Sequence, residues 1–123
     1  MCASLNMEGS FDFDLDTIDL NITKTSAGNY ALGIINSENN KFVVKYVGRS
    51  DDDLNCRLKK QFERYGVKYK NFKYSYATSP KSSFDNECKH YHAFKPSGNI
   101  LHPDRPTNSK WRCPVCTIFN IKP

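Results

Sequence analysis

Two segments of alternating residues, separated by a cluster of turn-forming residues, constrain the fold most strongly. Residues 29–35 read NYALGII and residues 41–48 read KFVVKYVG, and in each segment every second side chain is apolar or aromatic. Side chains two apart along a strand share one face of a sheet, so both segments are predicted strands. The residues between them, NSENN at 36–40, are of the types that form tight turns. The sequence therefore predicts a β-hairpin over residues 28–50.

Two tyrosines lie at the open end of this predicted hairpin. If the turn is centred near Glu38, Tyr30 on the first strand stands directly opposite Tyr46 on the second. Directly paired residues point to the same face of a sheet, so the two phenols are expected to be neighbours. A slip of one residue in the register would move one of them to the other face.

The segments that follow alternate between helical and extended patterns. Residues 50–65 carry apolar side chains at helical spacing after an acidic start, and Gly66 ends the pattern, which predicts a helix. Residues 71–77 (NFKYSYA) predict a third strand, and residues 81–94 predict a second helix. The expected fold is therefore α/β of the α+β type, a small three-stranded, mainly antiparallel sheet flanked by helices. The tail from Lys95 is irregular.

Charge is distributed unevenly along the chain. Residues 1–23 contain five acidic and no basic side chains, whereas the remaining residues hold all 18 basic side chains against 8 acidic ones. A body this basic is typical of a protein with a polyanionic partner, most often nucleic acid, but a basic surface that serves solubility alone gives the same count. The acidic segment is expected to be a solvated extension, and folding back onto the basic face is its alternative.

Two charged residues fall on or beside the apolar faces of the predicted helices. Glu87 lies between Phe84 and Tyr91 at spacings of three and four, where a carboxylate is costly unless it is paired, hydrogen-bonded or bound to a metal. A half-exposed glutamate paired with a nearby lysine is the structural alternative. Arg57 flanks the apolar stripe of the first helix, and its alternative is a stem that packs while its head reaches water.

Taken in order, these features resemble the GIY-YIG nuclease family. The first family signature is represented here by Gly28-Asn29-Tyr30 and the second by Tyr46-Val47-Gly48. An arginine-bearing helix, a third strand and a helix with an inward glutamate follow, as they do in the family's core. The resemblance covers roughly residues 27–100. It implies a nuclease core at residues 24–100, between an acidic N-terminal extension (1–23) and a C-terminal extension (101–123).

The resemblance implies a role for each matching residue. Tyr30 and Tyr46 match the two signature tyrosines, of which one helps to activate the attacking water and the other positions the water or the phosphate. Arg57 matches the helix arginine that holds the scissile phosphate. Glu87 matches the glutamate that binds a single divalent metal, Mg²⁺ or Mn²⁺.

Further positions are assigned in the same way. Gly48 matches a glycine that lets the substrate approach closely, Arg49 falls where many members have a basic residue, and Asn99 falls where several have an asparagine that supports the site. The chain departs from the pattern at Gln61, where many family nucleases have His or Tyr. Glutamine can bind a water or a phosphate but cannot take a proton, so Gln61 and its neighbour Lys60 are expected to contact DNA.

The assigned residues match the demands of phosphodiester hydrolysis. The reaction needs a deprotonated water, a Lewis acid on the phosphate and a cation for the developing charge. A tyrosine near its ordinary pKa of about 10 is a poor base at neutral pH. Arg49, Arg57 and the metal are therefore expected to lower the pKa of the nearby tyrosines.

A second constellation joins the second helix to the tail. Cys88 and His92 are four residues apart on one helical face, and Cys113 and Cys116 have the C-x-x-C spacing of a tetrahedral zinc site. These four residues predict a structural zinc site, with His102 competing with His92 as a ligand. The alternative is a buried Cys88 and a redox-exposed C-x-x-C. The same extension carries a cationic and aromatic cluster that is expected to grip DNA: Arg105, Lys110, Trp111 and Arg112.

The leading hypothesis is thus a metal-dependent endonuclease that hydrolyses DNA phosphodiester bonds, with branched or damaged DNA among its substrates. An inactive nucleic-acid-binding module, a zinc-stabilised interaction domain and a thiol redox protein are the alternatives. The sequence has no membrane span and no signal-peptide pattern, and its cysteines favour an intracellular setting. A chain of 123 residues leaves little room for a recognition domain, so a homodimer or a larger partner is expected to contribute specificity.

Overall fold

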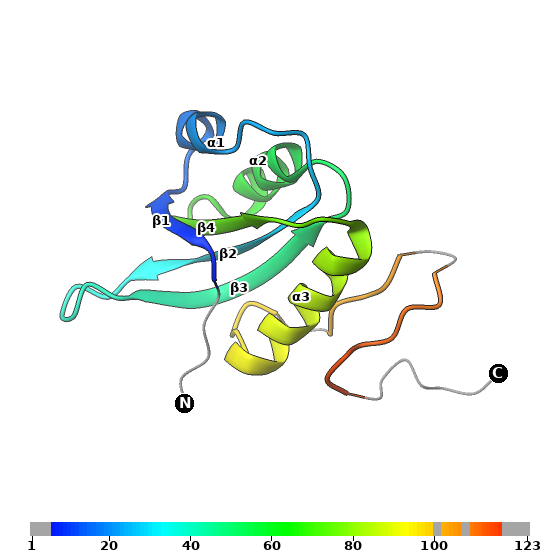
Figure 1. Ribbon diagram of the computed structural model, residues 1–123. Coiled ribbons are helices and arrows are strands. Elements are labelled where there is room, and N and C mark those ends of the chain that lie inside the picture. The colour runs from blue at the N-terminus through cyan, green and yellow to red at the C-terminus, as the bar shows by residue number, and fades with distance from the viewer. Residues whose placement is uncertain (1–5, 100–101, 107–108, 117–123) are drawn as a thin grey trace.

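The computed structural model describes residues 6–99, 102–106 and 109–116, and within them the fold is α+β, with three helices and a four-stranded antiparallel sheet (Figure 1). In chain order the elements are β1 (Glu8–Asp12), α1 (Leu15–Asn21), β2 (Gly28–Ile35), β3 (Phe42–Ser50), α2 (Leu54–Tyr65), β4 (Asn71–Tyr76) and α3 (Pro80–Phe94). The predicted hairpin, third strand and two helices are all present. The prediction of three strands is wrong, because β1 is a fourth.

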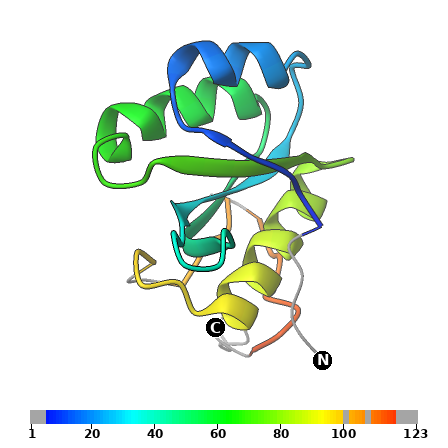
Figure 2. The same ribbon diagram turned by 90° about the vertical axis from the view of Figure 1, so that its left-hand side faces the viewer.

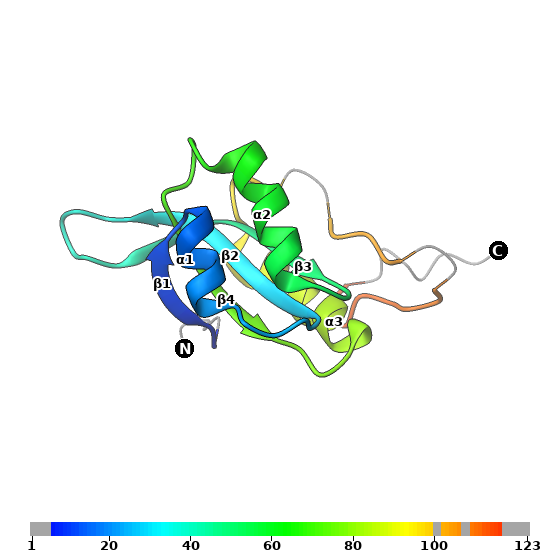
Figure 3. The same ribbon diagram turned by 90° about the horizontal axis from the view of Figure 1, so that it is seen from above.

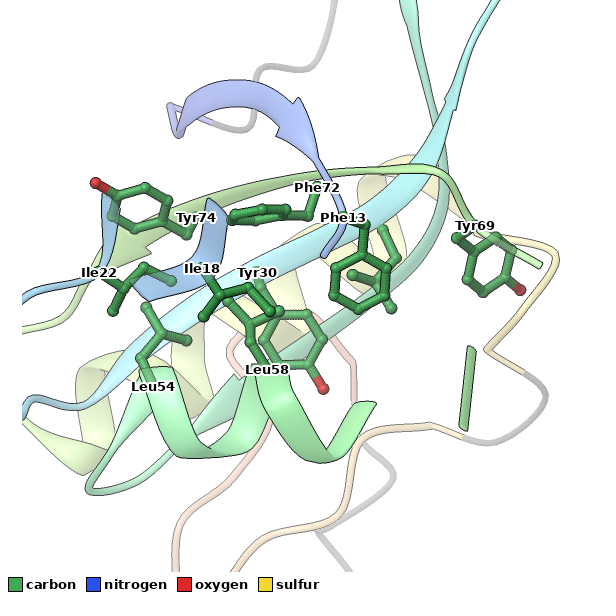
Figure 4. Packing of buried hydrophobic residues seen from close by; sticks show 10 residues of the cluster. Phe13, Ile18, Ile22, Tyr30, Leu54, Leu58, Tyr69, Phe72 and Tyr74 are labelled. Carbon is green, nitrogen blue, oxygen red and sulfur yellow. The ribbon is translucent and has the colours of Figure 1, made fainter. Parts of the chain in front are cut away.

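The sheet separates two helical layers. Its strands lie in the order β1-β4-β2-β3, with α1 and α2 on one face and α3 on the other (Figure 2). Seen from above, α1 and α2 lie across the strands of the sheet (Figure 3). The larger core lies between the sheet and the α1–α2 layer, and Figure 4 shows its side chains. A smaller cluster, Ala31 and Val47 with Tyr91 and Phe94, joins the sheet to α3.

The N-terminal segment belongs to this fold, which corrects the expectation of a solvated extension. Strand β1 pairs with β4, and Phe13, Ile18 and Ile22 are buried in the larger core. The acidic side chains of α1 face outward, and Asp14 caps the helix by accepting a hydrogen bond from the Thr17 amide. The apolar residues between the acids therefore supply the contacts that hold the segment on the sheet.

The register of the hairpin differs from the predicted one. Tyr30 lies opposite Gly48, and Tyr46 lies opposite Leu32. The pairing is shifted by one residue at the turn, and a bulge between Leu32 and Gly33 adds a second residue of shift toward the open end. A shift of two residues restores the original face, so Tyr30 and Tyr46 remain on one side of the sheet as diagonal neighbours.

No helix in the described part of the chain is long and apolar enough to cross a membrane.

The integration of α1 gives a stability prediction. Ile18 is fully buried, whereas Leu20, two residues away on the same helix, is 79% exposed. We expect Ile18→Ala to lower the free energy of unfolding by about 2–5 kcal/mol, because it leaves a cavity in the core. Leu20→Ala is the matched control and should change it by less than about 0.5 kcal/mol. Urea denaturation measures both, and equal effects would contradict the packing of α1 in the core.

Candidate active site

A cleft of about 510 Å³ opens between β2, β3, α2, α3 and the C-terminal extension. Five of the six predicted catalytic residues line it, namely Tyr30, Tyr46, Arg49, Arg57 and Glu87. The other lining residues are Ser50, Asp51, Asp52, Asp104, Arg105 and Pro106. Residues far apart in the sequence thus converge on one cavity.

The two tyrosines form one wall of the cleft. Their rings are stacked, with centroids 6.4 Å apart and planes 18° apart. Gly48 lies opposite Tyr30, and a Cβ at this position would come within 2.3 Å of the Tyr30 ring and hydroxyl. A glycine at position 48 therefore lets the Tyr30 ring lie across β3, where it is fully buried beside Leu58 (Figure 4).

The Tyr30 hydroxyl is buried at the margin of the core, and it has no hydrogen-bond partner of ordinary geometry among the described residues. Burial raises the pKa of Tyr30 far above its ordinary value, and the charge of Arg57, together with a weak hydrogen bond from its side chain, offsets only part of this rise. Burial also raises the pKa of Tyr46. Arg57 lowers the pKa of both tyrosines as expected, but burial outweighs its charge, so the net shift in the protein alone is upward. Both phenols keep their protons at neutral pH, so they act as hydrogen-bond donors.

Glu87 on α3 is almost completely buried and forms an ion pair. Its Oε1 accepts a hydrogen bond of 2.6 Å from Nη1 of Arg49, and Nε of Arg49 donates to Asp51 at 2.9 Å. The guanidinium also lies over the ring of Phe84, 5.1 Å from its centroid. Burial raises the pKa of Glu87, and Arg49 offsets part of the rise by favouring the carboxylate. Arg49 thus holds the carboxylate that was predicted to bind the divalent metal.

Arg57 is exposed on α2 and lines two cavities. It borders the cleft on one side and, on the other, a groove of about 570 Å³ that it shares with Lys60, Gln61, Glu63 and Arg64. Gln61 is 4% exposed, and its Oε1 has no hydrogen-bond partner within the described ranges. Gln61 therefore borders the groove rather than the cleft.

Asn99 lies outside the cleft lining and contacts the edge strand of the sheet. Its Oδ1 accepts from the Val47 amide at 2.8 Å, and its Nδ2 donates to the Val47 carbonyl at 2.9 Å. The amide of Gly98 donates to the Lys45 carbonyl at 2.7 Å. Together these bonds occupy backbone groups of β3 and fix the segment after α3 against Tyr46.

Several acidic lining residues were missed by sequence reasoning. Asp51 and Asp52 were interpreted only as the acidic start of a helix, and Asp53 alone caps that helix, by accepting from the Cys56 amide. Asp104 had no local signal, since its place in the cleft depends on the path of the tail. Asp51 also accepts from Ser83 Oγ at 3.3 Å, which ties the loop before α2 to α3.

A second cluster joins the C-terminal end of α3 to the extension. One ligand atom from each of His92, His102, Cys113 and Cys116 lies within 4.8 Å of the others, an arrangement that could bind a metal such as zinc. The two histidine Nε2 atoms are 3.2 Å apart, and Cys116 Sγ is 3.4 Å from His102 Nε2. Tetrahedral zinc with ordinary bond lengths has edges of about 3.3–3.8 Å, and these two distances lie close to that range. Both histidines belong to this set, and Cys88 does not.

The environment of the cluster suits metal ligation. His102 Nδ1 lies 2.8 Å from the Pro103 carbonyl, a contact that places the proton on Nδ1 and the metal-binding lone pair on Nε2. Burial raises the pKa of the Cys113 thiol, but hydrogen bonds from the amides of Val115 and Cys116 are the main causes that lower it to about 6 overall. Cys88 is fully buried beside Cys113, and burial raises the pKa of its thiol.

The cationic and aromatic residues of the extension are not equivalent. Trp111 packs on Phe84 of α3, with ring centroids 5.8 Å apart, and its carbonyl accepts from Arg105 Nη1 at 3.0 Å. Arg105 lines the cleft, whereas Lys110 and Arg112 are exposed and lie outside its lining. The Trp111 ring is therefore engaged in packing.

Comparisons with family models, curated proteins and solved structures return no match for this chain. The function is therefore inferred from its own residues and geometry.

The Tyr30 hydroxyl gives a prediction that separates function from stability. We expect Tyr30→Phe to leave the free energy of unfolding at pH 7 unchanged or higher, because it removes a buried hydroxyl that lacks a hydrogen bond. Tyr74→Phe is the control, since the Tyr74 hydroxyl donates to the Asn21 carbonyl at 3.0 Å, and it should cost about 1 kcal/mol. Urea denaturation compares the two variants. A loss above about 1 kcal/mol for Tyr30→Phe would contradict the missing bond.

The same variant has a defined pH dependence. Above about pH 10 the tyrosines of the unfolded chain lose protons while folded Tyr30 keeps its own, so the folded state binds more protons and stability falls as the pH rises. Tyr30→Phe should make this alkaline fall shallower than in the wild type. An identical fall would show that Tyr30 titrates at its ordinary pKa.

Proposed function

We propose that the protein is a metal-dependent endonuclease that hydrolyses DNA phosphodiester bonds in the cleft. One observation carries the proposal: two stacked phenols, an exposed arginine and a buried glutamate, drawn from four elements, line the same cavity. These are the groups that the resemblance to GIY-YIG nucleases assigned to catalysis. The basic body of the chain supports a polyanionic substrate.

The donors in the cleft fit a hard divalent cation. Glu87 Oε1 accepts from Arg49, which leaves Oε2 for a cation, and Asp51, Asp52 and Asp104 line the same cavity with further oxygen ligands. A bound Mg²⁺ or Mn²⁺ would stabilise the charge of the phosphate as a Lewis acid and lower the pKa of the attacking water. Glu87 is the best-placed ligand because it is buried and fixed on a helix.

The residues of the chain have separate tasks in this proposal. Arg57 binds the scissile phosphate, since a guanidinium matches phosphate oxygens in a two-pronged contact and stays charged. Tyr30 and Tyr46 hold their protons and donate hydrogen bonds that position the attacking water or a phosphate oxygen. Arg49 favours the ionised form of Glu87 against the effect of its burial. The groups are held in place before substrate binds, which lowers the cost of reaching the transition state.

A nucleic-acid-binding module without catalysis is the second candidate. The ion pair between Arg49 and Glu87 favours it, because a carboxylate already paired with a cation binds a metal less readily. The raised pKa values of both tyrosines and the glutamine at position 61 point the same way. In this case Arg57, Lys60 and Arg64 on α2 would form the phosphate-binding surface.

The metal in the second cluster is proposed to be zinc in a structural role. A set of two thiolates and two imidazoles is typical of closed zinc sites, which hold a fold together and leave no position for substrate, and here one ligand atom from each residue lies within 4.8 Å of the others. Such thiolate ligands are compatible with a reducing, intracellular setting.

DNA cleavage tests the proposed activity. Plasmid, branched and single-stranded DNA are incubated with Mg²⁺ or Mn²⁺ and with wild type, Tyr30→Phe, Arg57→Ala or Glu87→Gln. We expect the wild type to cleave at least one substrate and each variant to be slower by about 100-fold or more, because each change removes a group that acts on the transition state. Glu38→Gln in the exposed hairpin turn is the control and should match the wild type. Equal cleavage by every variant would indicate a contaminant and exclude the site.

The binding arm of the same experiment uses two adjacent lysines of α2. Lys60 is exposed beside Arg57, whereas Lys59 is paired with Asp19 at 2.7 Å. If α2 binds duplex phosphates, Lys60→Ala should reduce the slope of log affinity against log salt by about 0.9, and Lys59→Ala should leave it unchanged. Fluorescence anisotropy without divalent metal measures the slopes. Binding with this difference but no cleavage by the wild type would favour the second candidate, and no binding would exclude both.

A further inference from the structure

One wall of the cleft comes from the C-terminal extension. Asp104, Arg105 and Pro106 line the same cavity as Tyr30 and Glu87, although they follow α3 by ten residues or more. This wall is bracketed in sequence by ligands of the second cluster, His102 on one side and Cys113 on the other. The cleft and the metal cluster therefore share a single stretch of chain.

The backbone of this stretch has little support of its own. Residues 102–106 and 109–116 contain no helix or strand. Bonds within these residues include two that join residues close in sequence, Ser109 N to the Pro106 carbonyl at 3.0 Å and Arg105 Nη1 to the Trp111 carbonyl at 3.0 Å. Without a hydrogen-bonded ladder, side-chain anchors must hold the stretch against α3.

Side-chain contacts of this kind connect the metal cluster to the Arg49–Glu87 ion pair of the cleft. Cys113 packs with Phe84 and Cys88 of α3, and Trp111, two residues earlier, lies on the Phe84 ring. The guanidinium of Arg49 lies over that same ring and holds Glu87. His92 extends the attachment toward the end of α3. A continuous set of contacts thus connects the ligands to the inner wall of the cleft.

We propose that zinc bound by His92, His102, Cys113 and Cys116 is a positioning element of the cleft, holding residues 104–106 in place as its outer wall. His92 supplies one ligand from α3, and the extension supplies the other three, one before residues 104–106 and two after them. The metal therefore restrains the stretch at both of its ends, whereas bonds between residues close in sequence do not attach it to α3. Loss of the metal releases the wall, removes Arg105 from the lining of the cleft and opens the Arg49–Glu87 pair to water. Nucleic-acid binding in the cleft then depends on zinc, a step that rests on the proposed function.

The test uses the full chain and a matched pair of cysteine variants. Cys116→Ser removes one ligand, and Cys56→Ser, at an exposed position on α2 outside the cluster, is the control. Zinc content, amide hydrogen exchange at residues 104 and 105, and affinity for a fluorescent DNA oligonucleotide are measured without divalent metal in the buffer. Cys116→His, which restores a fourth ligand, tests for rescue.

We expect the wild type and Cys56→Ser to contain about one zinc per chain, since structural sites hold the metal tightly. Cys116→Ser should lose the metal, exchange faster at residues 104 and 105 while the amides of β2 stay protected, and bind DNA at least fivefold more weakly. Cys116→His should recover all three properties.

Three results would overturn the proposal: zinc retained in full by Cys116→Ser, zinc lost with unchanged exchange at residues 104 and 105, or faster exchange there with unchanged DNA affinity. Failure of zinc-loaded wild type to bind any DNA would instead count against the proposed function. In that event the exchange measurement alone decides whether zinc holds the wall.

Discussion

The close approach of Tyr30 to Gly48 is the contact on which the candidate site depends. The ring of Tyr30 crosses β3 only because position 48 has no Cβ, and any larger residue there would displace the ring. From this position the ring packs against Leu58 of α2 and stacks beside Tyr46, and its hydroxyl reaches the cleft. The hairpin, the core and the cleft are therefore linked through one side chain.

The cleft holds polar groups that a structure selected for stability alone would lack. A buried hydroxyl without a hydrogen bond costs free energy, and a buried ion pair such as Arg49–Glu87 gives little net stability once its desolvation is counted. Both lie in the same cavity, next to an exposed arginine. Groups retained at a cost to stability, and placed where a ligand has access, are typical of functional sites.

The sequence predicted the helices and strands better than the strand register and the contacts between distant segments. Alternation and helical spacing identified the hairpin, β4, α2 and α3, because each pattern is local. The predicted register is wrong by one residue at the turn and by two at the open end, because the bulge at Leu32–Gly33, which has no local signal, adds the second residue. The acidic residues of the N-terminal segment led to the prediction of a solvated extension. The few apolar side chains between them are nevertheless enough to pack β1 and α1 on the core. Helical spacing predicted Cys88 and His92 as ligands on one face of α3. In the structure His102 takes the place of Cys88 in the metal cluster, and its position there depends on the path of the tail.

The central claim is that one cleft binds both a divalent metal and the scissile phosphate, and anomalous diffraction tests it most directly. Crystals of the Tyr30→Phe protein, used to slow turnover, would be grown with Mn²⁺ and a short DNA duplex. We expect a manganese peak within about 2.3 Å of a Glu87 carboxylate oxygen, with a DNA phosphate on the Arg57 guanidinium. DNA bound elsewhere, or bound in the cleft with Arg49 still on Glu87 and no manganese, would contradict it.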